Sequence, residues 1–201
     1  YVLYVIMRMI GRLAFPLFCF MLVEGYGKSR SVGRYSLRLL VFALISEVPF
    51  DMAFYRSCYY PLYQNVGFTL LLGLLLLWVC DWIDRSVKDP IVGMIGQILA
   101  LGGFMAAAML LGCDYSYGGI MLIWLIYKSR RKTDLLPIGM LAGILVITML
   151  SSAVELAGLL AIPAVLMYSG EKGKINKILE YGFYPGHLLI LGLLTMYVFG
   201  V

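Results

Sequence analysis

Long apolar runs separated by short polar stretches make up most of the chain, and they predict eight helical segments. The periodicity of the runs is helical, and Leu70 to Leu77 is almost unbroken apolar sequence, so the alternation typical of a β-barrel is not followed. The segments are expected at residues 5–26, 35–55, 66–83, 91–112, 116–127, 134–150, 153–168 and 176–200. A membrane span needs about 20 apolar residues, so the fifth run is short and the sixth and seventh are marginal. The pattern predicts an all-α, polytopic integral membrane helix bundle with about eight transmembrane segments, forming one domain over residues 1–201.

Composition supports lipid as the solvent, yet ionisable side chains interrupt the apolar runs. Hydrophobic residues make up 62% of the 201 positions, and the mean hydropathy is +0.92. The interrupting residues are Arg8, Arg12, Glu24, Glu47, Asp51, Glu155 and His187. A charge near the bilayer centre costs on the order of 3 kcal/mol, so such residues usually face a cavity and serve chemistry or transport. We therefore expect a polar interior.

The basic residues follow the alternation of the loops. Thirteen of the 16 lysines and arginines fall in or beside the loops near residues 28–38, 85–88, 128–132 and 172–177, whereas the intervening loops hold only Arg56. By the positive-inside rule, the four basic loops are cytoplasmic. The excess of basic residues that gives the net charge of +5 is therefore explained by membrane topology. We expect no nucleic-acid partner.

Cysteines and sequence motifs narrow the chemistry. The four cysteines show no metal-ligand spacing, and a Walker loop, a nucleotide-binding GxGxxG motif and a GxSxG elbow are missing from the sequence. ATP-driven transport and classical hydrolase chemistry are thus unsupported, and no metal site is expected. Two alternatives stay open for the thiols: a disulfide between Cys58 and Cys113, which lie near the outer loops, or burial as small hydrophobes.

Like-charged pairs one helical turn apart suggest an ionic ligand on each side of the bundle. Arg34 and Arg38, with Lys28 and Tyr35 nearby, could form a cytoplasmic phosphate site, or they could simply anchor the helix at the membrane surface. On the outer side, four carboxylates would make an acidic vestibule for a cationic group: Glu47, Asp51, Asp114 and Glu155. The alternative is that these carboxylates pair internally with Arg8 and Arg12.

His187 is the single histidine of the chain. If its helix starts near Lys174, thirteen residues at about 1.5 Å each place His187 roughly 20 Å along the helix, near the middle of the bilayer and just beyond a kink expected at Pro185. A neutral imidazole there could act as a base, or it could form a hydrogen bond that only packs helices together.

Several motifs together resemble the TraX family of membrane proteins. They are IGRLAFPLFCFMLVEGY at 10–26, RYSLRLLVFALISEVPFD at 34–51, QNVGFTLLLGL at 64–74, the Asp114–Tyr115 pair, YSGEKGK at 168–174 and YGFYPGHLLIL at 181–191. The resemblance runs from about residue 8 to residue 191. The family is named for the protein that acetylates the amino terminus of conjugative pilin, and it looks related to transmembrane acyltransferases that take acyl groups from cytoplasmic acyl-CoA.

The resemblance implies an acetyl-CoA-dependent N-acetyltransferase in the bacterial cytoplasmic membrane. Its partners would be the lipid bilayer, coenzyme A and a peptide or amine acceptor such as the amino terminus of a pilin-like subunit. The expected catalytic residues are His187, Arg12 and Tyr184. Coenzyme A would be bound by Lys28, Arg34, Tyr35, Arg38, Lys172 and Lys174. The acceptor would be bound by Glu24, Glu47, Asp51, Asn65, Asp114 and Tyr115.

Two alternatives accompany this interpretation. Family members usually begin with an additional helix that ends in an Asp-His-Ile-Gly motif, and the histidine of that motif could be the base in place of His187. The second alternative is a multi-pass transporter or channel for a small cation or peptide, in which the same charges line a permeation path.

Overall fold

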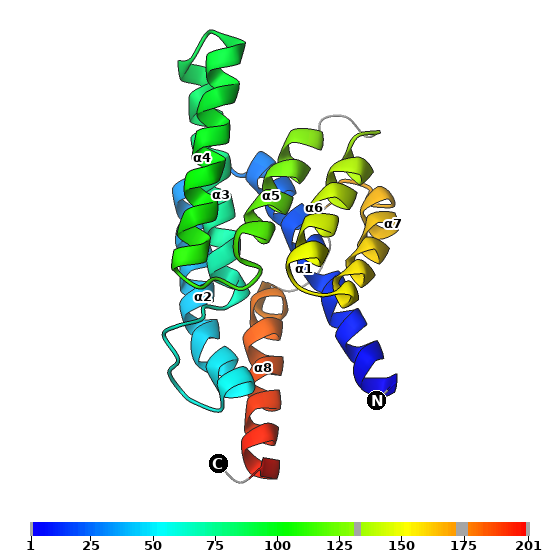
Figure 1. Ribbon diagram of the computed structural model, residues 1–201. Coiled ribbons are helices and arrows are strands. Elements are labelled where there is room, and N and C mark those ends of the chain that lie inside the picture. Colours follow the sequence, from blue (N-terminus) through cyan, green and yellow to red (C-terminus); the bar gives the residue numbers. More distant parts are fainter. Residues whose placement is uncertain (1, 131–133, 172–176, 200–201) are drawn as a thin grey trace.

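The computed structural model describes residues 2–130, 134–171 and 177–199, and within these ranges the chain is built from helices (Figure 1). The elements are α1 (Val2–Lys28), α2 (Val32–Tyr55), α3 (Val66–Ser86), α4 (Pro90–Leu110), α5 (Ser116–Ser129), α6 (Leu136–Leu150), the 3-10 helix η1 (Ala153–Leu160), α7 (Ala161–Leu166) and α8 (Lys177–Phe199). The all-α prediction is confirmed, and each expected run corresponds to a helical segment. The seventh run differs in kind, because its first eight residues form a 3-10 helix before the α-helix begins.

Capping residues explain where several helices begin. The Ser31 hydroxyl accepts from the Arg34 N–H at the start of α2, and the Asn65 side chain accepts from the Gly67 N–H at the start of α3. Asp89 accepts from the N–H groups of Ile91 and Val92, and Pro90 occupies the first position of α4. Serine, asparagine and aspartate are preferred at these positions because they satisfy the N–H groups that the first turn leaves free.

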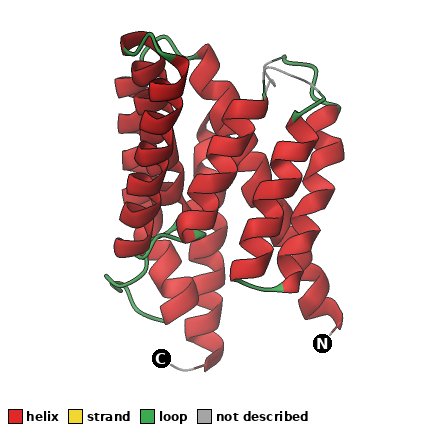
Figure 2. Ribbon diagram, turned by 45° about the horizontal axis from the view of Figure 1, so that its top comes forward, coloured by secondary structure: helices red, strands yellow, loops and turns green. Residues whose placement is uncertain are grey.

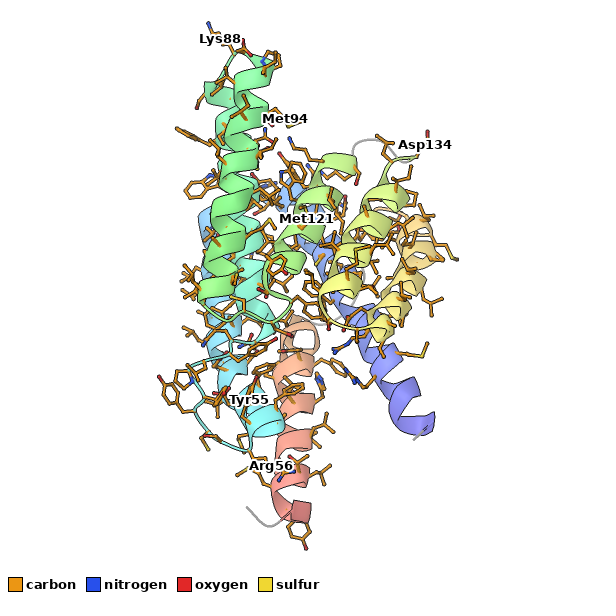
Figure 3. All side chains as sticks on the ribbon, in the orientation of Figure 1. Tyr55, Arg56, Lys88, Met94, Met121 and Asp134 are labelled. Carbon is orange, nitrogen blue, oxygen red and sulfur yellow. The ribbon has the colours of Figure 1, made fainter. Side chains whose placement is uncertain are left out.

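The helices run between two ends of the bundle (Figure 2). The loops after α1, α3, α5 and α7 lie at one end, here called the basic end, which is the upper end of Figure 1, and Lys88 and Asp134 mark it in Figure 3. Arg56 lies toward the opposite end, where both termini are found (Figures 1 and 3). The described residues of the four basic loops therefore lie at one end, as the alternation predicted.

Among the described residues, two helices are long and apolar enough to cross a membrane: α3 and α4. The apolar helices α6 and η1–α7 are shorter. Only about a fifth of the most apolar stretch of α4 is buried, and Leu110 at its end is 87% exposed. The outer face of α4 therefore presents apolar side chains to the surroundings of the molecule.

The core lies around α5, which contacts α1, α3, α4 and α6. Leu74, Ile123 and Ile126 are fully buried there. Glycines let the neighbouring helices approach closely: a Cβ at Gly73 would lie 2.3 Å from Ile123, and one at Gly143 would lie 2.6 Å from Leu122. This close approach lets a helix of only 14 residues, α5, sit in the middle of longer helices.

The disulfide alternative for the cysteines is wrong. All four thiols are free, and Cys19, Cys80 and Cys113 are buried, as expected for small hydrophobes, whereas Cys58 is exposed. The Cys113 side chain is shielded from solvent, whereas the Cys58 side chain is not.

A carboxylate joins three helices near the basic end. Asp81 of α3 accepts a hydrogen bond of 2.6 Å from the Tyr26 hydroxyl of α1, and its other oxygen accepts from the Tyr127 hydroxyl of α5. Arg85 lies 3.6 Å away on the exposed side. Loss of Asp81 would leave the Tyr127 hydroxyl without this acceptor, and the Tyr26 hydroxyl with only the Leu77 carbonyl oxygen at 3.4 Å.

We therefore predict that Asp81→Ala destabilises the fold. Hydrogen bonds to a charged group contribute about 1.5–3 kcal/mol each, and the substitution should lower the midpoint of thermal unfolding by roughly 5–10 °C. Thermal unfolding of the purified protein measures this effect. Asp134→Ala is the control, because Asp134 is exposed at the same end. Equal unfolding temperatures of Asp81→Ala and the wild type would contradict the role given to this carboxylate.

Candidate functional site

An ion pair joins α1 to η1 on the side of the bundle that carries the termini. Arg12 Nε lies 2.8 Å from Glu155 Oε1, and the Glu155 side chain is only 5% exposed. The Arg12 guanidinium also lies 6.0 Å from the centre of the Tyr115 ring. Of the two alternatives for Glu155, internal pairing with an arginine is confirmed. Glu155 does not contribute a free carboxylate to an acidic vestibule.

The turn between α4 and α5 supplies Asp114 and Tyr115. Asp114 Oδ1 accepts from the Tyr115 N–H at 3.1 Å and from the Tyr63 hydroxyl at 3.4 Å. The Thr69 hydroxyl donates to the Asp114 carbonyl oxygen. Burial raises the pKa of Asp114 to about 6, although the Tyr115 N–H and Arg12 favour the charged form. Asp114 therefore titrates close to neutral pH.

The backbone of this turn is strained. Tyr115 has a φ of 59° and Ser116 a φ of 42°, both in the left-handed region that residues other than glycine rarely adopt. Such conformations cost of order 1–3 kcal/mol each and persist where the surrounding structure holds them. Here the Tyr115 ring stacks on Phe15 with centroids 3.6 Å apart, so packing against α1 stabilises the strained turn.

The α2–α3 loop, residues 56–65, approaches two carboxylates near the end of α2. Asp51 Oδ2 accepts from the Tyr60 N–H at 2.7 Å, and Glu47 Oε2 accepts from the Asn65 N–H at 3.3 Å. The Asn65 amide group also donates to Glu47 Oε2 and to the Ala43 carbonyl oxygen. Both N–H bonds of the Asn65 side-chain amide are thus used inside the protein. Asn65 therefore positions Glu47.

His187 lies at the same depth as Glu47. Helices α2 and α8 run side by side, with Phe42 packed on Tyr184 and Gly192 against Met52, so His187 is level with the stretch of α2 around residues 45–47. His187 Nδ1 is 2.8 Å from the Phe183 carbonyl oxygen. A carbonyl can only accept, so Nδ1 carries the hydrogen, and Nε2 of the neutral ring is left with a free lone pair.

Tyr184 connects α8 to the start of α3. Its side chain lies close to the backbone of Val66, and its ring centroid lies 5.6 Å from the ring centroid of His187. Helix α8 continues across Pro185 from Lys177 to Phe199. Residues 172–176, which include Lys172 and Lys174, lie outside the described part of the chain.

The residues expected to bind phosphate divide into two groups at the basic end. Lys28 is fully engaged: its Nζ lies 2.8 Å from the Gly170 carbonyl oxygen, 3.2 Å from the Tyr168 hydroxyl and 3.4 Å from Glu24 Oε2. An ammonium group has three donors, so Lys28 latches α1 to the α7–α8 loop. Glu24 therefore lies at the basic end. By helix rise along α1, it is about 20 Å from Arg12, the partner of Glu155.

Arg34 and Arg38 are exposed at this end. Arg38 Nε donates to the Arg34 carbonyl oxygen at 3.3 Å, and its guanidinium lies over the Tyr35 ring at 5.7 Å. The Tyr35 side chain packs against Gly25 of α1, so its ring is already covered on one side. The phosphate role of the two arginines stays a prediction.

Between the two ends, the described core is apolar. Leu74, Leu77, Ile123 and Ile126 are fully buried between the Asp81 network and the Asp114 turn. The polar groups of the described chain therefore form two clusters separated by an apolar layer.

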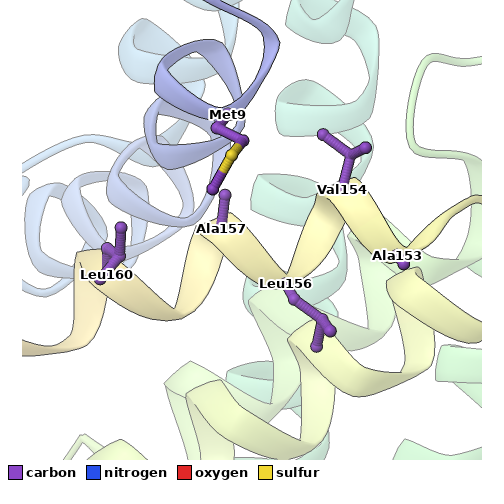
Figure 4. A pocket seen from close by; sticks show the side chains of 6 residues that line it. All are labelled: Met9, Ala153, Val154, Leu156, Ala157 and Leu160. Carbon is purple, nitrogen blue, oxygen red and sulfur yellow. The ribbon is translucent and has the colours of Figure 1, made fainter. Parts of the chain in front are cut away.

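A shallow apolar depression lies beside the Arg12–Glu155 pair (Figure 4). It has a volume of about 460 Å³, and it is lined by Met9, Ala153, Val154, Leu156, Ala157 and Leu160. Because all six side chains are apolar, this surface suits a hydrocarbon chain better than a polar ligand.

The structure thus brings most of the expected acceptor and catalytic residues to one level. Glu47, Asn65, Asp114, Tyr115 and Arg12 connect through the contacts above, and the Tyr184 hydroxyl meets the start of α3 that Asn65 caps. Sequence reasoning placed neither Tyr63 nor Thr69 in this cluster. Both act through Asp114, and no spacing in the sequence signals a contact between residues 45 or 51 positions apart.

Comparison with known proteins identifies relatives. The family model described as TraX protein matches residues 2–195. A probable fimbrial assembly protein FimC, serogroup H1, of Dichelobacter nodosus is 31% identical over 210 residues, which cover 94% of this chain and 82% of that protein. No solved structure matches the chain.

The raised pKa of Asp114 predicts a pH dependence of stability. The folded protein binds the proton of Asp114 more tightly than the unfolded chain, so this group favours folding below about pH 4 and loses that contribution as the pH rises to about 6. Asp114→Asn carries no charge, so its thermal stability should fall less between pH 4.5 and 7 than that of the wild type. Unfolding temperatures across this range measure the difference. Parallel pH profiles would contradict the assignment.

Proposed function

The chain belongs to the TraX protein family, and from this membership we propose that it is a membrane-embedded, acyl-CoA-dependent acyltransferase. Its reaction is the N-acetylation of the amino terminus of a membrane-bound or exported peptide. The acyl donor, acetyl-CoA, enters from the cytoplasm. The printed name of the Dichelobacter nodosus relative, a probable fimbrial assembly protein, supports a pilus subunit as the acceptor.

Placement in the bacterial cytoplasmic membrane is supported by the surface and by the ends of the bundle. Helices α3 and α4 are long enough to span, and the exposed face of α4 carries Ile91, Leu99 and Leu110. Contiguous apolar surface of this kind is unfavourable in water and favourable in lipid. The shared end of the basic loops then faces the cytoplasm.

The observation that carries the enzymatic proposal is the separation of charge along the bundle. Exposed arginines Arg34 and Arg38 lie at the basic end, and the half-buried carboxylates Glu47 and Asp114 lie at the level of His187. Along α2, Glu47 lies thirteen residues from Arg34 and nine residues from Arg38, which is about 20 Å and about 14 Å by helix rise. A donor with phosphates at one end and an amine acceptor at the other would be matched by this arrangement.

Acyl transfer gives a role to each group at the level of His187. The acceptor ammonium must lose a proton before its nitrogen attacks the thioester carbonyl carbon. The N–C bond then forms and the C–S bond breaks. The attacking nitrogen gives up a second proton as it becomes an amide, and the departing thiolate of coenzyme A takes up that proton. His187 Nε2 is the proton acceptor, Arg12 stabilises the developing oxyanion, and Tyr184 orients the imidazole.

The transporter or channel alternative is less well supported. A permeation path needs polar groups or water along the whole bundle, whereas the buried side chains of Leu74, Leu77, Ile123 and Ile126 fill the described core between the two polar clusters.

We predict that His187→Gln abolishes most of the acetyl transfer. A general base contributes roughly 10²–10⁴-fold to the rate, so the turnover number should fall by that order while acetyl-CoA still binds. The assay is transfer of labelled acetyl from acetyl-CoA to peptides with free amino termini by the purified protein. Tyr197→Phe is the control, because Tyr197 is exposed on the same helix. Full activity of His187→Gln would remove His187 as the base and favour the histidine of the additional family helix.

The phosphate site predicts a different signature. Arg34→Gln combined with Arg38→Gln should raise the KM for acetyl-CoA by about tenfold or more and leave the turnover number nearly unchanged, because arginine–phosphate contacts are charge-assisted and far from the reacting atoms. Arg85→Gln, another exposed arginine at this end, serves as the matched control. An unchanged KM in the double variant would argue against phosphate binding by this pair.

A further inference from the structure

Two buried carboxylate oxygens on one face of α2 lack a hydrogen-bond partner among the described residues. They are Glu47 Oε1 and Asp51 Oδ1. The Asp51 residue is only 1% exposed. The second oxygen of each carboxylate is held by the α2–α3 loop, through the N–H groups of Asn65 and Tyr60. Each carboxylate thus has one oxygen fixed and one oxygen available.

The two free oxygens belong to neighbouring side chains. Glu47 and Asp51 are four residues apart in α2, which places them on the same helix face, and their charges interact. None of the three ion pairs of the described chain involves either residue. Two adjacent buried carboxylates repel each other and lose hydration, so this face is unfavourable until a cation or protons neutralise it.

Aromatic rings surround the end of this face. Phe50 and Tyr63 are stacked with centroids 6.3 Å apart, Tyr55 and Tyr60 are stacked at 3.9 Å, and Tyr55 lies 6.1 Å from Tyr63. The backbone N–H of Tyr60, a member of this cluster, is the group that holds Asp51. Aromatic faces attract cations. Phe50 and Tyr55 belong to α2, whereas Tyr60 and Tyr63 belong to the α2–α3 loop that covers Asp51.

We propose that Glu47 and Asp51 form a binding site for a primary ammonium group, and, on the basis of the proposed function, that this group is the amino terminus of the acceptor peptide. An ammonium group offers three N–H donors, enough to reach both free oxygens, and its charge offsets theirs. Calcium requires six to eight oxygen ligands, many more than the two available here. In the described chain, no group of three or more histidine, cysteine or acidic side chains could hold a metal ion.

The site discriminates between substrate and product. Acetylation converts an ammonium with three N–H donors into a neutral amide with one, so the product can no longer neutralise the two carboxylates. The free acceptor is therefore bound and the acetylated product is released. Because Asp51 is covered by the α2–α3 loop, the loop must move for the ammonium to enter.

Binding can be measured without the transfer reaction. The probes are a neutral hexapeptide amide with a free amino terminus and the same peptide N-acetylated, titrated into the purified full chain by calorimetry. The wild type should bind the free peptide at least about tenfold more tightly than the acetylated peptide, since charge-assisted hydrogen bonds are lost on acetylation. Equal affinities of the wild type for the two peptides would overturn the proposal.

Glu47→Gln and Asp51→Asn keep the size of each side chain and remove its charge. Each variant should weaken binding of the free peptide by about tenfold and reduce the discrimination against the acetylated peptide. Asp134→Asn, an exposed carboxylate at the basic end, is the matched control and should bind as the wild type does. Unchanged discrimination in both single variants would also overturn the proposal. Should either variant fail to fold, the comparison of the two peptides on the wild type still decides.

The outcome is separable from that of the proposed function. If the free peptide binds selectively but no acetyl is transferred, the ammonium site stands and the acyltransferase proposal falls. If acetyl is transferred and the KM for the peptide is unchanged in Glu47→Gln and Asp51→Asn, the enzyme stands and the ammonium site falls.

Discussion

The ion pair between Arg12 and Glu155 joins α1 to η1 beside the turn that carries Asp114 and Tyr115. Breaking a buried pair by removing one partner leaves an uncompensated charge and typically costs 3–5 kcal/mol, so the two elements are held at this point. The pair also places Arg12 beside Tyr115, whose strained backbone is stabilised by stacking on Phe15. The position of the Asp114 turn, and through it the level at which the carboxylates gather, depends on this contact.

Helix positions followed from the sequence because the apolar runs are long and the capping residues are local. Asn65 and Asp89 each satisfy N–H groups only two or three residues away, so their effect can be recognised without tertiary structure. The seventh run was harder to predict. An eight-residue 3-10 helix has poorer hydrogen-bond geometry than an α-helix, and it exists here because Glu155 and Gly158 pack against α1.

The candidate site was only partly predictable, because it depends on depth and on contacts between distant loops. Glu24 and Glu47 both interrupt apolar runs, but Glu24 is four residues from the end of α1 and is paired with Lys28 at the basic end. Lys28 was assigned to phosphate from its charge, whereas the α7–α8 loop takes up its donors. Arg12 pairs internally with Glu155. Arg34 and Arg38 are exposed, as both phosphate binding and anchoring at the membrane surface require.

A short bridge between Gln64 and Cys113 links the α2–α3 loop to the turn between α4 and α5. The Gln64 N–H donates to the Gly112 carbonyl oxygen, and the Asp114 N–H donates to the Gln64 carbonyl oxygen, both at 2.9 Å. The loop that covers Asp51 is therefore attached by its backbone to the turn that carries Asp114 and Tyr115. A movement of the α2–α3 loop that uncovers Asp51 must therefore either break these two backbone hydrogen bonds or shift the turn that carries Asp114 as well.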